Sequence, residues 1–442
     1  MNSKQQTKFK QTDIGLIPEE WEVKELKALC VEGGIQTGPF GSQLHNRDYV
    51  SEGTPIITVE HLGDNRIIHN DLPKVSDNDR IRLNKYSIKE GDIIFSRVGS
   101  VDRRAIAKKT EEGWLFSGRC LRVRTDREKI VPSFLSYYFG LEKFKERVRS
   151  YAFGATMPSL NTKLLMDMKV VVPQISEQRV IAKIFSDFDL KIDLNQQMNK
   201  ILESIGQALF KHWFIDFEFP NEEGNPYKSS GGEMVYSEEL QIEIPNGWIV
   251  KSIDEIANFL NGLALQKFPV HEDEEYLPVI KIRELKQGIT ESSDKANLSI
   301  PEEYVVDDGD ILFSWSGSLE VVIWYYGKGA LNQHLFKVTS DTYPKWFYYY
   351  WTLHYLPEYR CIAEGKATTM GHIQRQHLKN SLVIVPTVKV LEEMNKLMKS
   401  IIEKLIQINV ESRNLSQIRD ALLPKLMSGQ LRVPVPQTET AI

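Results

Sequence analysis

The sequence predicts an α+β protein in which two tandem mixed α/β domains are separated by two long antiparallel coiled-coil helices. Two observations predict this fold: an internal repeat that spans the chain, and a change within each copy from strand-like to helical texture. A chain of 442 residues is too long for one ordinary core, which favours two or three domains. We therefore expect an internal pseudo-two-fold repeat.

The repeat consists of five pairs of segments that keep their order along the chain. "IPEEWEVK" at 17–24 returns as "IPNGWIVK" at 244–251, and "GDIIFSRVGSV" at 91–101 returns as "GDILFSWSGSL" at 309–319. The other pairs are 55–62 with 278–285, 170–174 with 383–387, and 202–210 with 415–423. The offset falls steadily from 227 to 213, so the second copy is about 14 residues shorter. Coincidence could explain one such pair, but not five in register.

The sequence pattern changes once within each copy, from one typical of strands to one typical of a helix. Short β-branched or aromatic runs such as "TPIITV" and "DMKVVVP" are followed, after Pro173, by more than 40 residues without proline. The expected organisation is a first domain at 1–175, a central helix at 176–217, a linker at 218–243, a second domain at 244–388 and a C-terminal helix at 389–431. The linker is rich in Gly, Ser, Pro and acidic residues, so we expect it to be exposed.

Apolar residues recur every seven positions over about five heptads in both predicted helices, which favours a coiled coil. The expected helix-pairing residues are Ile181, Phe188, Asn195, Leu202, Ile205, Leu209, Ile401, Ile408, Leu415, Ile418 and Leu422. A second line of each seam runs through Ile184, Lys191, Met198, Ile205 and His212, and through Leu397, Lys404, Glu411, Ile418 and Lys425. In an antiparallel pair, Lys191 or Lys404 could meet Glu411 or Asn195 and fix the register. The alternative, in which each helix packs only on its own domain, stays open.

The two copies of the "GDI" segment share a framework and then diverge. We interpret the shared residues as a turn followed by a buried strand: Gly91, Asp92, Ile93, Phe95 and Ser96. The copies differ most where Arg97 is replaced by Trp315 and Val98 by Ser316. A retained framework with altered loops is typical of two readers of different sequences.

The chain carries a local basic stretch from Arg97 to Arg124, with eight basic and three acidic residues in a protein of net charge −5. Such a stretch can contact phosphates and base edges, although a solvated basic hairpin is the alternative. The loop "FGATMPSLN" at 153–161 offers hydroxyl groups and backbone amides, and ordinary turns explain it equally well. The expected DNA-contacting residues are Arg97, Arg103, Arg104, Lys108, Lys109, Arg119, Thr156, Ser159, Asn161, Trp315, Ser316 and Thr369.

Other classes of function have little support. There is no Walker loop, HExxH motif or Ser/His/Asp arrangement, so we expect no catalytic and no metal-ligating residue. Cys30, Cys120 and Cys361 are widely separated and read as reduced thiols. No apolar run approaches the roughly 20 residues of a membrane helix, and the N-terminus is polar, so we expect a soluble, cytoplasmic protein.

Taken together, these segments closely resemble the DNA-specificity subunit of type I restriction–modification enzymes. The resemblance is carried by the duplicated "IPxxW" starts, the paired "GDIxFSxxGS" segments, the "GATMPSLN" loop, the two "VxVP" strands that lead into long helices, and the linker "FEFPNEEGNPYKSSGGEMVYSEEL". It covers the chain from about Ile17 to Arg432. One departure is that the second copy lacks the basic stretch, which leaves its DNA-contacting loop unplaced.

The resemblance implies two target-recognition domains, each of which reads one half of a bipartite, asymmetric DNA site. It implies that the helices set the spacing between the half-sites and dock two methyltransferase subunits. Those partners would supply S-adenosylmethionine binding, and motor–endonuclease subunits would use ATP and Mg²⁺, so this subunit would bind no cofactor and have no catalytic activity. Two alternatives stay open: a self-contained nuclease or methyltransferase with an unrecognised active site, and a coiled-coil scaffold that binds only protein.

Overall fold

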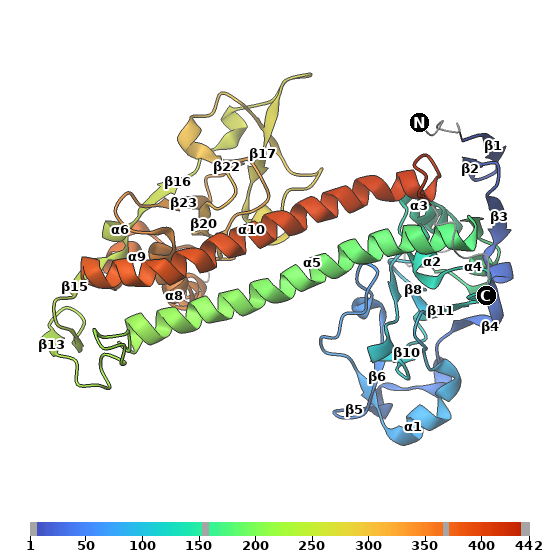
Figure 1. Ribbon diagram of the computed structural model, residues 1–442, viewed down its shortest axis with the longest axis horizontal. Coiled ribbons are helices and arrows are strands. Elements are labelled where there is room, and N and C mark those ends of the chain that lie inside the picture. Colours follow the sequence, from blue (N-terminus) through green and yellow to red (C-terminus); the bar gives the residue numbers. More distant parts are fainter. Residues whose placement is uncertain (1–6, 153–158, 366–370, 435–442) are drawn as a thin grey trace. The chain divides into compact units, whose positions relative to one another are not determined.

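The computed structural model describes residues 7–152, 159–365 and 371–434, and the chain divides into two compact units. Unit 1 comprises Met1–Leu190 and Ser416–Ile442, and unit 2 comprises Lys191–Leu415. Two long helices, α5 (Ile175–Phe210) and α10 (Val388–Met427), are drawn in green and red in Figure 1, and each contributes residues to both units. No helix in the described part of the chain is long and apolar enough to cross a membrane.

Unit 1 contains twelve named strands and four short helices besides its parts of α5 and α10. The strands are β1 (Phe9–Thr12), β2 (Gly15–Pro18), β3 (Glu22–Glu25), β4 (Cys30–Thr37), β5 (Tyr49–Val50), β6 (Thr54–Ile57), β7 (Lys74–Val75), β8 (Ile93–Ser96), β9 (Arg104–Ile106), β10 (Leu115–Phe116), β11 (Cys120–Thr125) and β12 (Lys169–Val172). The helices are α1 (Asp77–Arg82), α2 (Pro132–Phe139), α3 (Glu142–Tyr151) and α4 (Thr162–Met166). These counts refer to the described residues.

Unit 2 likewise has twelve named strands and four helices among the described residues, besides its parts of α5 and α10. Its strands are β13 (Met234–Ser237), β14 (Ile242–Pro245), β15 (Ile249–Ser252), β16 (Asn258–Asn261), β17 (Tyr276–Ile280), β18 (Lys295–Asn297), β19 (Val305–Val306), β20 (Ile311–Ser314), β21 (Val321–Ile323), β22 (Gly329–Leu331), β23 (Leu335–Thr339) and β24 (Leu382–Val385). Its helices are α6 (Ile253–Ile256), α7 (Ile282–Gln287), α8 (Lys345–Glu364) and α9 (Arg375–Asn380).

The sheets show that the two copies have one topology. A four-stranded antiparallel sheet has the order β4-β11-β8-β9 in unit 1 and β16-β23-β20-β21 in unit 2. A parallel pair joins β6 to β10 and its counterpart β17 to β22, and a two-stranded ladder joins β3 to β12 and β15 to β24. The predicted α+β repeat is therefore confirmed, with one difference: the edge strand β5 pairs with β7 in unit 1, whereas the edge strand β19 pairs with β22 in unit 2.

The shared "GDI" segment is structural scaffold in both units. Gly91 and Gly309 have φ angles of +85° and +91°, which only glycine adopts readily. The following aspartates close the turn by accepting a hydrogen bond from a backbone N–H three residues earlier, at 2.8 Å in each copy. The strands β8 and β20 that follow are buried along their whole length. Both units thus need the same residues here.

The long helices pair antiparallel within unit 2, because positions that rise along α5 meet positions that fall along α10. Asn195 Nδ2 donates to Glu411 Oε2 at 3.0 Å, and Asn199 Nδ2 donates to Asn409 Oδ1 at 2.8 Å. Lys191 Nζ lies 3.3 Å from Glu411 Oε2, as the register prediction requires. Asn195 is only 2% exposed. A displaced register would leave this amide buried without a partner, so the pair specifies the alignment.

The second predicted line of the seam is wrong by one residue in each helix. The buried and half-buried face of α5 follows 4-3 spacing through Ile181, Phe185, Phe188, Ile192, Asn195, Asn199, Leu202, Gly206 and Leu209. That of α10 runs through Met394, Met398, Ile401, Leu405, Ile408, Ser412, Leu415, Arg419, Leu422 and Leu426. The predicted pairing residues Ile205 and Ile418 are instead 43% and 47% exposed. The buried faces contain polar or small residues at 199, 206, 412 and 419, so a search for apolar residues every seven positions does not detect them.

The predicted linker is exposed at most of its positions, as expected, and it is also folded. Phe219 is 4% exposed and stacks on Trp248 with ring centroids 4.8 Å apart. Strand β13, within the same segment, pairs with β14 as β1 pairs with β2. The hairpin that precedes the "IPxxW" segment is therefore repeated as well.

The counterpart of this aromatic contact in unit 1 is charged. Trp21, which corresponds to Trp248, donates from Nε1 to Glu177 Oε2 at 2.9 Å. Arg432, which corresponds to Phe219, lies with its guanidinium carbon 5.7 Å from the Trp21 ring centroid. Its Nε donates to Glu177 Oε1 at 2.9 Å, and its Nη1 also bonds Glu20. The C-terminal segment is thus held to the start of unit 1 by ion pairs.

A second pair of equivalent sites lies where a tyrosine meets the long helices. In unit 1, Tyr137 donates to Asp189 Oδ2 at 2.6 Å, and Arg419 Nη1 donates to Asp189 Oδ1 at 2.8 Å. In unit 2 the corresponding tyrosine, Tyr350, faces Gly206. Its buried hydroxyl group has no hydrogen-bond partner among the described residues.

Candidate nucleic-acid interface

The basic stretch from Arg97 to Arg124 does not form one surface. Strands β8 and β9 form an antiparallel hairpin in which Phe95 lies opposite Arg104 and Ile93 opposite Ile106. Arg97 follows the last residue of β8 and Lys108 follows the end of β9, so they lie at opposite ends of the hairpin. Four strand residues span about 13 Å. The positive charge is therefore divided between two separate places.

One of these places brings together residues from four segments, which we call the unit 1 cluster: Phe40, Arg97, Arg119 and Ser159. The backbone N–H of Arg97 donates to the carbonyl of Arg119 at 2.8 Å. The Arg97 guanidinium carbon lies 5.9 Å from the Phe40 ring centroid, and its Nη1 donates to the carbonyl of Gly118 at 3.1 Å. Ser159 forms a bridge with the residue after Arg97.

The cations of the unit 1 cluster are available to a ligand. Arg119 is exposed, and its side chain makes no hydrogen bond or ion pair with any residue that the structure describes. Arg97 is half-buried: its Nη1 donates to Gly118, and its Nε is buried without a hydrogen-bond partner among the described residues, so only the remaining N–H groups of its two Nη atoms could reach a ligand. Arg103, in the loop at the same end of the hairpin, donates from Nη2 to the carbonyl of Leu62 at 2.6 Å. Free guanidinium donors of this kind bind phosphates or the O6 and N7 atoms of guanine.

Arg104 is buried, so the prediction that it contacts DNA is wrong. It is 5% exposed, its Nε donates to the carbonyl of Ser136 at 2.6 Å, and its Nη1 donates to Asp64 Oδ1 at 3.1 Å. Burial lowers the pKa of Arg104, while the Asp64 carboxylate acts in the opposite direction. The guanidinium joins β9 to the helix α2 and is a structural group.

Lys108 and Lys109 are exposed but lie at the other end of the hairpin. Lys109 forms an ion pair with Glu112, and Glu111 accepts a hydrogen bond from the Lys108 backbone. The structure therefore does not bring these lysines to the unit 1 cluster. Asn161 is exposed and caps α4, because its Oδ1 accepts from Leu164 N at 2.8 Å. Thr156 and Thr369 lie outside the described residues.

Unit 2 carries a cluster at the corresponding place, which we call the unit 2 cluster: Asn261, Trp315, Gln333 and His334. Trp315 Nε1 donates to Asn261 Oδ1 at 2.8 Å, and its ring centroid lies 5.8 Å from that of His334. Gln333 Nε2 lies 3.5 Å from His334 Nε2. Three of these four residues, all but Trp315, are missing from the sequence-based prediction.

Ser316 supports this cluster from below. It is 3% exposed, and its hydroxyl group lies 3.0 Å from His334 Nδ1. A side chain this buried does not reach a ligand, so the prediction of direct DNA contact by Ser316 is wrong. Its hydrogen bond instead orients the imidazole ring of His334.

The two clusters occupy equivalent positions of the repeat. The backbone N–H of Trp315 points to the carbonyl of His334 at 3.4 Å, as that of Arg97 points to Arg119. The bridge between the segments 98 and 159 likewise recurs between 316 and 372. Arg97 therefore corresponds to Trp315, and Arg119 corresponds to His334. Extending the alignment of the repeat from "GDI" to "LNQHL" at 331–335 would have located His334 from the sequence.

A different kind of surface runs along α5. Leu194, Met198, Ile201 and Ile205 follow 4-3-4 spacing and are 49%, 42%, 60% and 43% exposed. A shallow depression lies over the last two of these residues and Ala208. An apolar stripe of this spacing fits another helix or an apolar protein surface and offers nothing to a phosphate.

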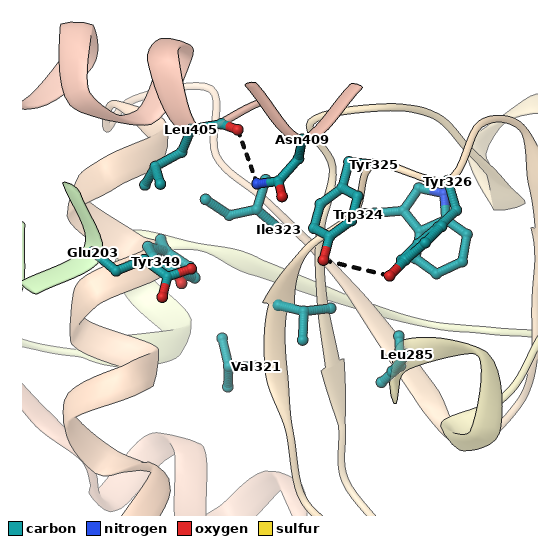
Figure 2. Close-up of a pocket in the computed structure, with 11 residues that line it drawn as sticks. Glu203, Leu285, Val321, Ile323, Trp324, Tyr325, Tyr326, Tyr349, Leu405 and Asn409 are labelled. Atoms are coloured by element: carbon teal, nitrogen blue, oxygen red, sulfur yellow. Dashed lines mark hydrogen bonds between the residues drawn. The ribbon is translucent and has the colours of Figure 1, made fainter. Parts of the chain in front are cut away.

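The enclosed cavity of unit 2 is a packing feature rather than a reaction site. Figure 2 shows Glu203 of α5, Tyr349 of α8 and Asn409 of α10 around a space of about 140 Å³ beside β21. Burial raises the pKa of Glu203. The lining contains no His, Lys, Ser or Cys that could act with this carboxylate. Within the described residues, no group of three or more His, Cys, Asp or Glu side chains could hold a metal ion.

Comparison with known proteins gives one consistent result. The model of the type I restriction modification DNA specificity domain matches residues 18–204 and again 245–419. The MjaIX specificity subunit of Methanocaldococcus jannaschii is 29% identical over 445 residues, covering 97% of each chain. The HindI specificity subunit of Haemophilus influenzae is 22% identical, covering 85% of this chain and 95% of its own. The crystal structure of the S subunit from M. genitalium shares the fold, with a TM-score of 0.57, 15% identity, and coverage of 96% and 98%.

Proposed function

We propose that this chain, which belongs to the type I restriction modification DNA specificity family, reads one half of a bipartite, asymmetric DNA site with each of its two units. The chain is a DNA sequence-specificity subunit and is non-catalytic. The assignment of reading to the unit 1 and unit 2 clusters is supported by one observation above all. The repeated framework carries different side chains at equivalent positions of the two units: Arg97 corresponds to Trp315, and Arg119 corresponds to His334.

The chemistry of the clusters supports half-sites of different sequence. In unit 1, Arg97 and Arg119 suit phosphate oxygens or the two acceptors of guanine. In unit 2, Gln333 offers an amide group and His334 an imidazole ring, and Gln pairs with the donor and acceptor of adenine. Because the framework is shared and the side chains are not, the two halves of the site differ.

Mapping of methylated bases in the DNA of the host tests this function. The expected result is a split motif in which two constant segments flank a gap of fixed length. Replacing Arg119 with Ala is expected to relax one segment, and replacing His334 with Ala the other. If either substitution alters both segments equally, or if the motif is continuous, the assignment of one half-site to each unit is wrong.

The salt dependence of DNA binding tests which end of the β8–β9 hairpin contacts the phosphates of DNA. Each phosphate contact contributes about 0.9 to the slope of log affinity against log salt concentration. We expect Arg119→Ala to reduce the slope by about one if Arg119 binds a phosphate, and Lys109→Ala to leave it unchanged. A larger change from Lys109→Ala would place the DNA at the opposite end of the hairpin.

We propose that α5 and α10 set the gap between the half-sites. The 36 residues of α5 span about 54 Å at 1.5 Å per residue, more than one turn of B-DNA at about 34 Å. Deleting 195–201 together with 406–412 removes one heptad from each helix and takes out the paired polar residues jointly. The preferred gap is then expected to shorten by about 10 Å, or about three base pairs. An unchanged gap would exclude this role.

The apolar stripe of α5 supports docking of methyltransferase subunits. S-adenosylmethionine, ATP and Mg²⁺ are expected on the partner subunits, with motor–endonuclease subunits completing a cytoplasmic complex. A charge at Ile201, which is 60% exposed, would face an apolar partner surface. Ile201→Glu is therefore expected to abolish co-purification of the methyltransferase without changing the helical content of the chain. Gln197→Glu, at an exposed polar position of the same helix, is the control and should co-purify normally.

A further inference from the structure

An exposed aromatic side chain stands in the unit 1 cluster. Phe40 is 61% exposed, although a side chain of this size is usually buried. It lies between the end of β4 and a 3₁₀ turn at Gly41–Gln43. The described part of the core does not account for it, so its exposure needs another explanation.

The backbone that presents Phe40 is fixed by two glycine contacts. A Cβ atom on Gly38 would lie 2.2 Å from the carbonyl oxygen of Ser117, and one on Gly118 would lie 2.5 Å from that of Pro39 and 2.9 Å from Phe40 Cβ. Neither glycine could be replaced without displacing main chain. The loop is therefore clamped against the segment that leads to Arg119, and the phenyl ring is a pre-positioned contact rather than part of a freely moving loop.

The Arg97 guanidinium covers one face of the ring. Its central carbon lies 5.9 Å from the Phe40 ring centroid, within the range of a cation–π contact. A phenyl wedge inserted between base pairs must offer both of its faces to the bases. Phe40 has only one free face and its edge, so its geometry favours a lateral contact with an apolar group.

We propose that Phe40 recognises the 5-methyl group of a thymine in the half-site read by unit 1, next to the base pair contacted by Arg97 or Arg119. The thymine methyl is the apolar group that base pairs present in the major groove, and Phe is among the side chains that contact it. This inference rests on the proposed function. It adds a specificity-determining residue to the unit 1 cluster.

The second copy provides an internal control. Gly38 N donates to the carbonyl of Cys120 at 3.2 Å, and Gly262 N donates to that of Leu335 at 3.0 Å, so the two glycines are equivalent. Two residues after Gly262 lies Ala264, which therefore stands in the place of Phe40. We expect no methyl recognition of this kind in the half-site read by unit 2.

Replacement of each thymine of the mapped site by deoxyuridine tests the proposal. The full-length chain, assembled with its methyltransferase partners, is titrated with duplexes that carry one replacement at a time. Removal of one buried methyl group is expected to weaken binding by about fourfold at one position of the unit 1 half-site. Phe40→Ala should bind the thymine and deoxyuridine duplexes equally. Leu16→Ala, at a residue of the same unit that is 60% exposed, should retain the difference.

Three results would overturn the proposal: a unit 1 half-site without thymine, equal binding of every replaced duplex by the unaltered chain, or a methyl effect that persists in Phe40→Ala. Loss of binding by Phe40→Ala that is equal on both duplexes, with unstacking of a 2-aminopurine reporter by the unaltered chain, would identify a wedge instead. If the unaltered assembly binds no bipartite duplex, the proposed function itself fails. That outcome is distinct from specific binding without methyl dependence.

Discussion

Replacement of Gly206 by alanine tests how unit 2 packs against α5. An ideal Cβ atom at this position would lie 1.9 Å from Tyr350 Oη and 2.8 Å from its Cζ. Tyr350 is only 2% exposed, so its ring has no solvent-filled space into which it can move. Its hydroxyl group is also buried without a hydrogen-bond partner in the described residues. The added methyl group must therefore displace a packed aromatic side chain.

Two opposing effects set the change in the free energy of unfolding that Gly206→Ala causes. Alanine is favoured over glycine in a helix interior by about 1 kcal/mol. Overpacking of a well-filled core costs about 1–3 kcal/mol, and a required displacement of more than 1 Å places this site toward the upper end. We expect Gly206→Ala to lower the free energy of unfolding of unit 2 by about 1–2 kcal/mol. For a unit of 225 residues (191–415) this corresponds to a fall in Tm of about 2–8 °C.

Thermal unfolding followed by tryptophan fluorescence reports mainly on unit 2, because six of the eight tryptophans lie there. Tyr350→Phe removes the unpaired hydroxyl and is expected to raise Tm slightly. In the Tyr350→Phe background, Gly206→Ala should lower the free energy of unfolding by less, because Tyr350 Oη, the atom closest to the added methyl group, is absent. Ala208→Gly, at an exposed position of the same helix, measures the helix-propensity effect alone and should cost about 1 kcal/mol.

A rise in Tm for Gly206→Ala in the unaltered background would contradict the contact. An equal loss of unfolding free energy from Gly206→Ala in the Tyr350→Phe background would also contradict it, because the double-mutant cycle would then show no coupling between the two sites.

Three further predictions follow from burial and exposure. Arg104→Gln is expected to destabilise unit 1 by about 1–3 kcal/mol, since it leaves the carbonyl of Ser136 without its donor and removes the ion pair with the exposed Asp64; thermal unfolding that matches the unaltered chain would contradict this. Burial raises the pKa of Cys30 and of Cys120 to about 12, so at pH 8 a thiol reagent should modify only the exposed Cys361 rapidly; a second fast-reacting thiol would refute this. Lys191→Ala removes an ion pair whose partners are about half exposed, and should change stability by less than about 1 kcal/mol; a larger loss would show that the pair is shielded from solvent.

Much of the fold could be predicted because the chain contains its own alignment. Five paired segments located the equivalent strands, and the strict identity at Gly91 and Asp92 reflects a backbone turn that both copies need. The contact of Lys191 with Glu411 could be predicted because opposite charges at a helix seam restrict the register. Such information is local or periodic, and a sequence displays it directly.

The errors arise where three-dimensional neighbours decide the outcome. Gly206 and Asn199 lie on the buried face of α5 because a tyrosine and an asparagine from other helices fill the space beside them. A count of apolar residues assigns that face to Ile205 instead. Similarly, the basic stretch looks continuous in the sequence, but the antiparallel turn after Arg97 sends Lys108 to the other end of the hairpin.

The residues that we propose to read DNA were the hardest to place together from the sequence. Phe40 and Arg97 are far apart in the sequence and meet only because Gly38 and Gly118 let two loops approach closely. Arginine commonly contacts DNA, and Arg97 was predicted to do so, but nothing in the sequence indicates that Phe40 lies beside it. The sequence does contain the repeat. Structural alignment of its two copies shows that His334 is equivalent to Arg119.

The unlike contacts made by Trp21 and Trp248 give the two units different sensitivities to their surroundings. Arg432 contacts unit 1 through ion pairs with carboxylates, which dissolved ions weaken. Phe219 contacts unit 2 through stacked aromatic rings, and salting-out ions strengthen such apolar contacts. As ionic strength increases, the segment around Arg432 should therefore detach from the start of unit 1, and its backbone amides should exchange with solvent, well before the segment around Phe219 loosens.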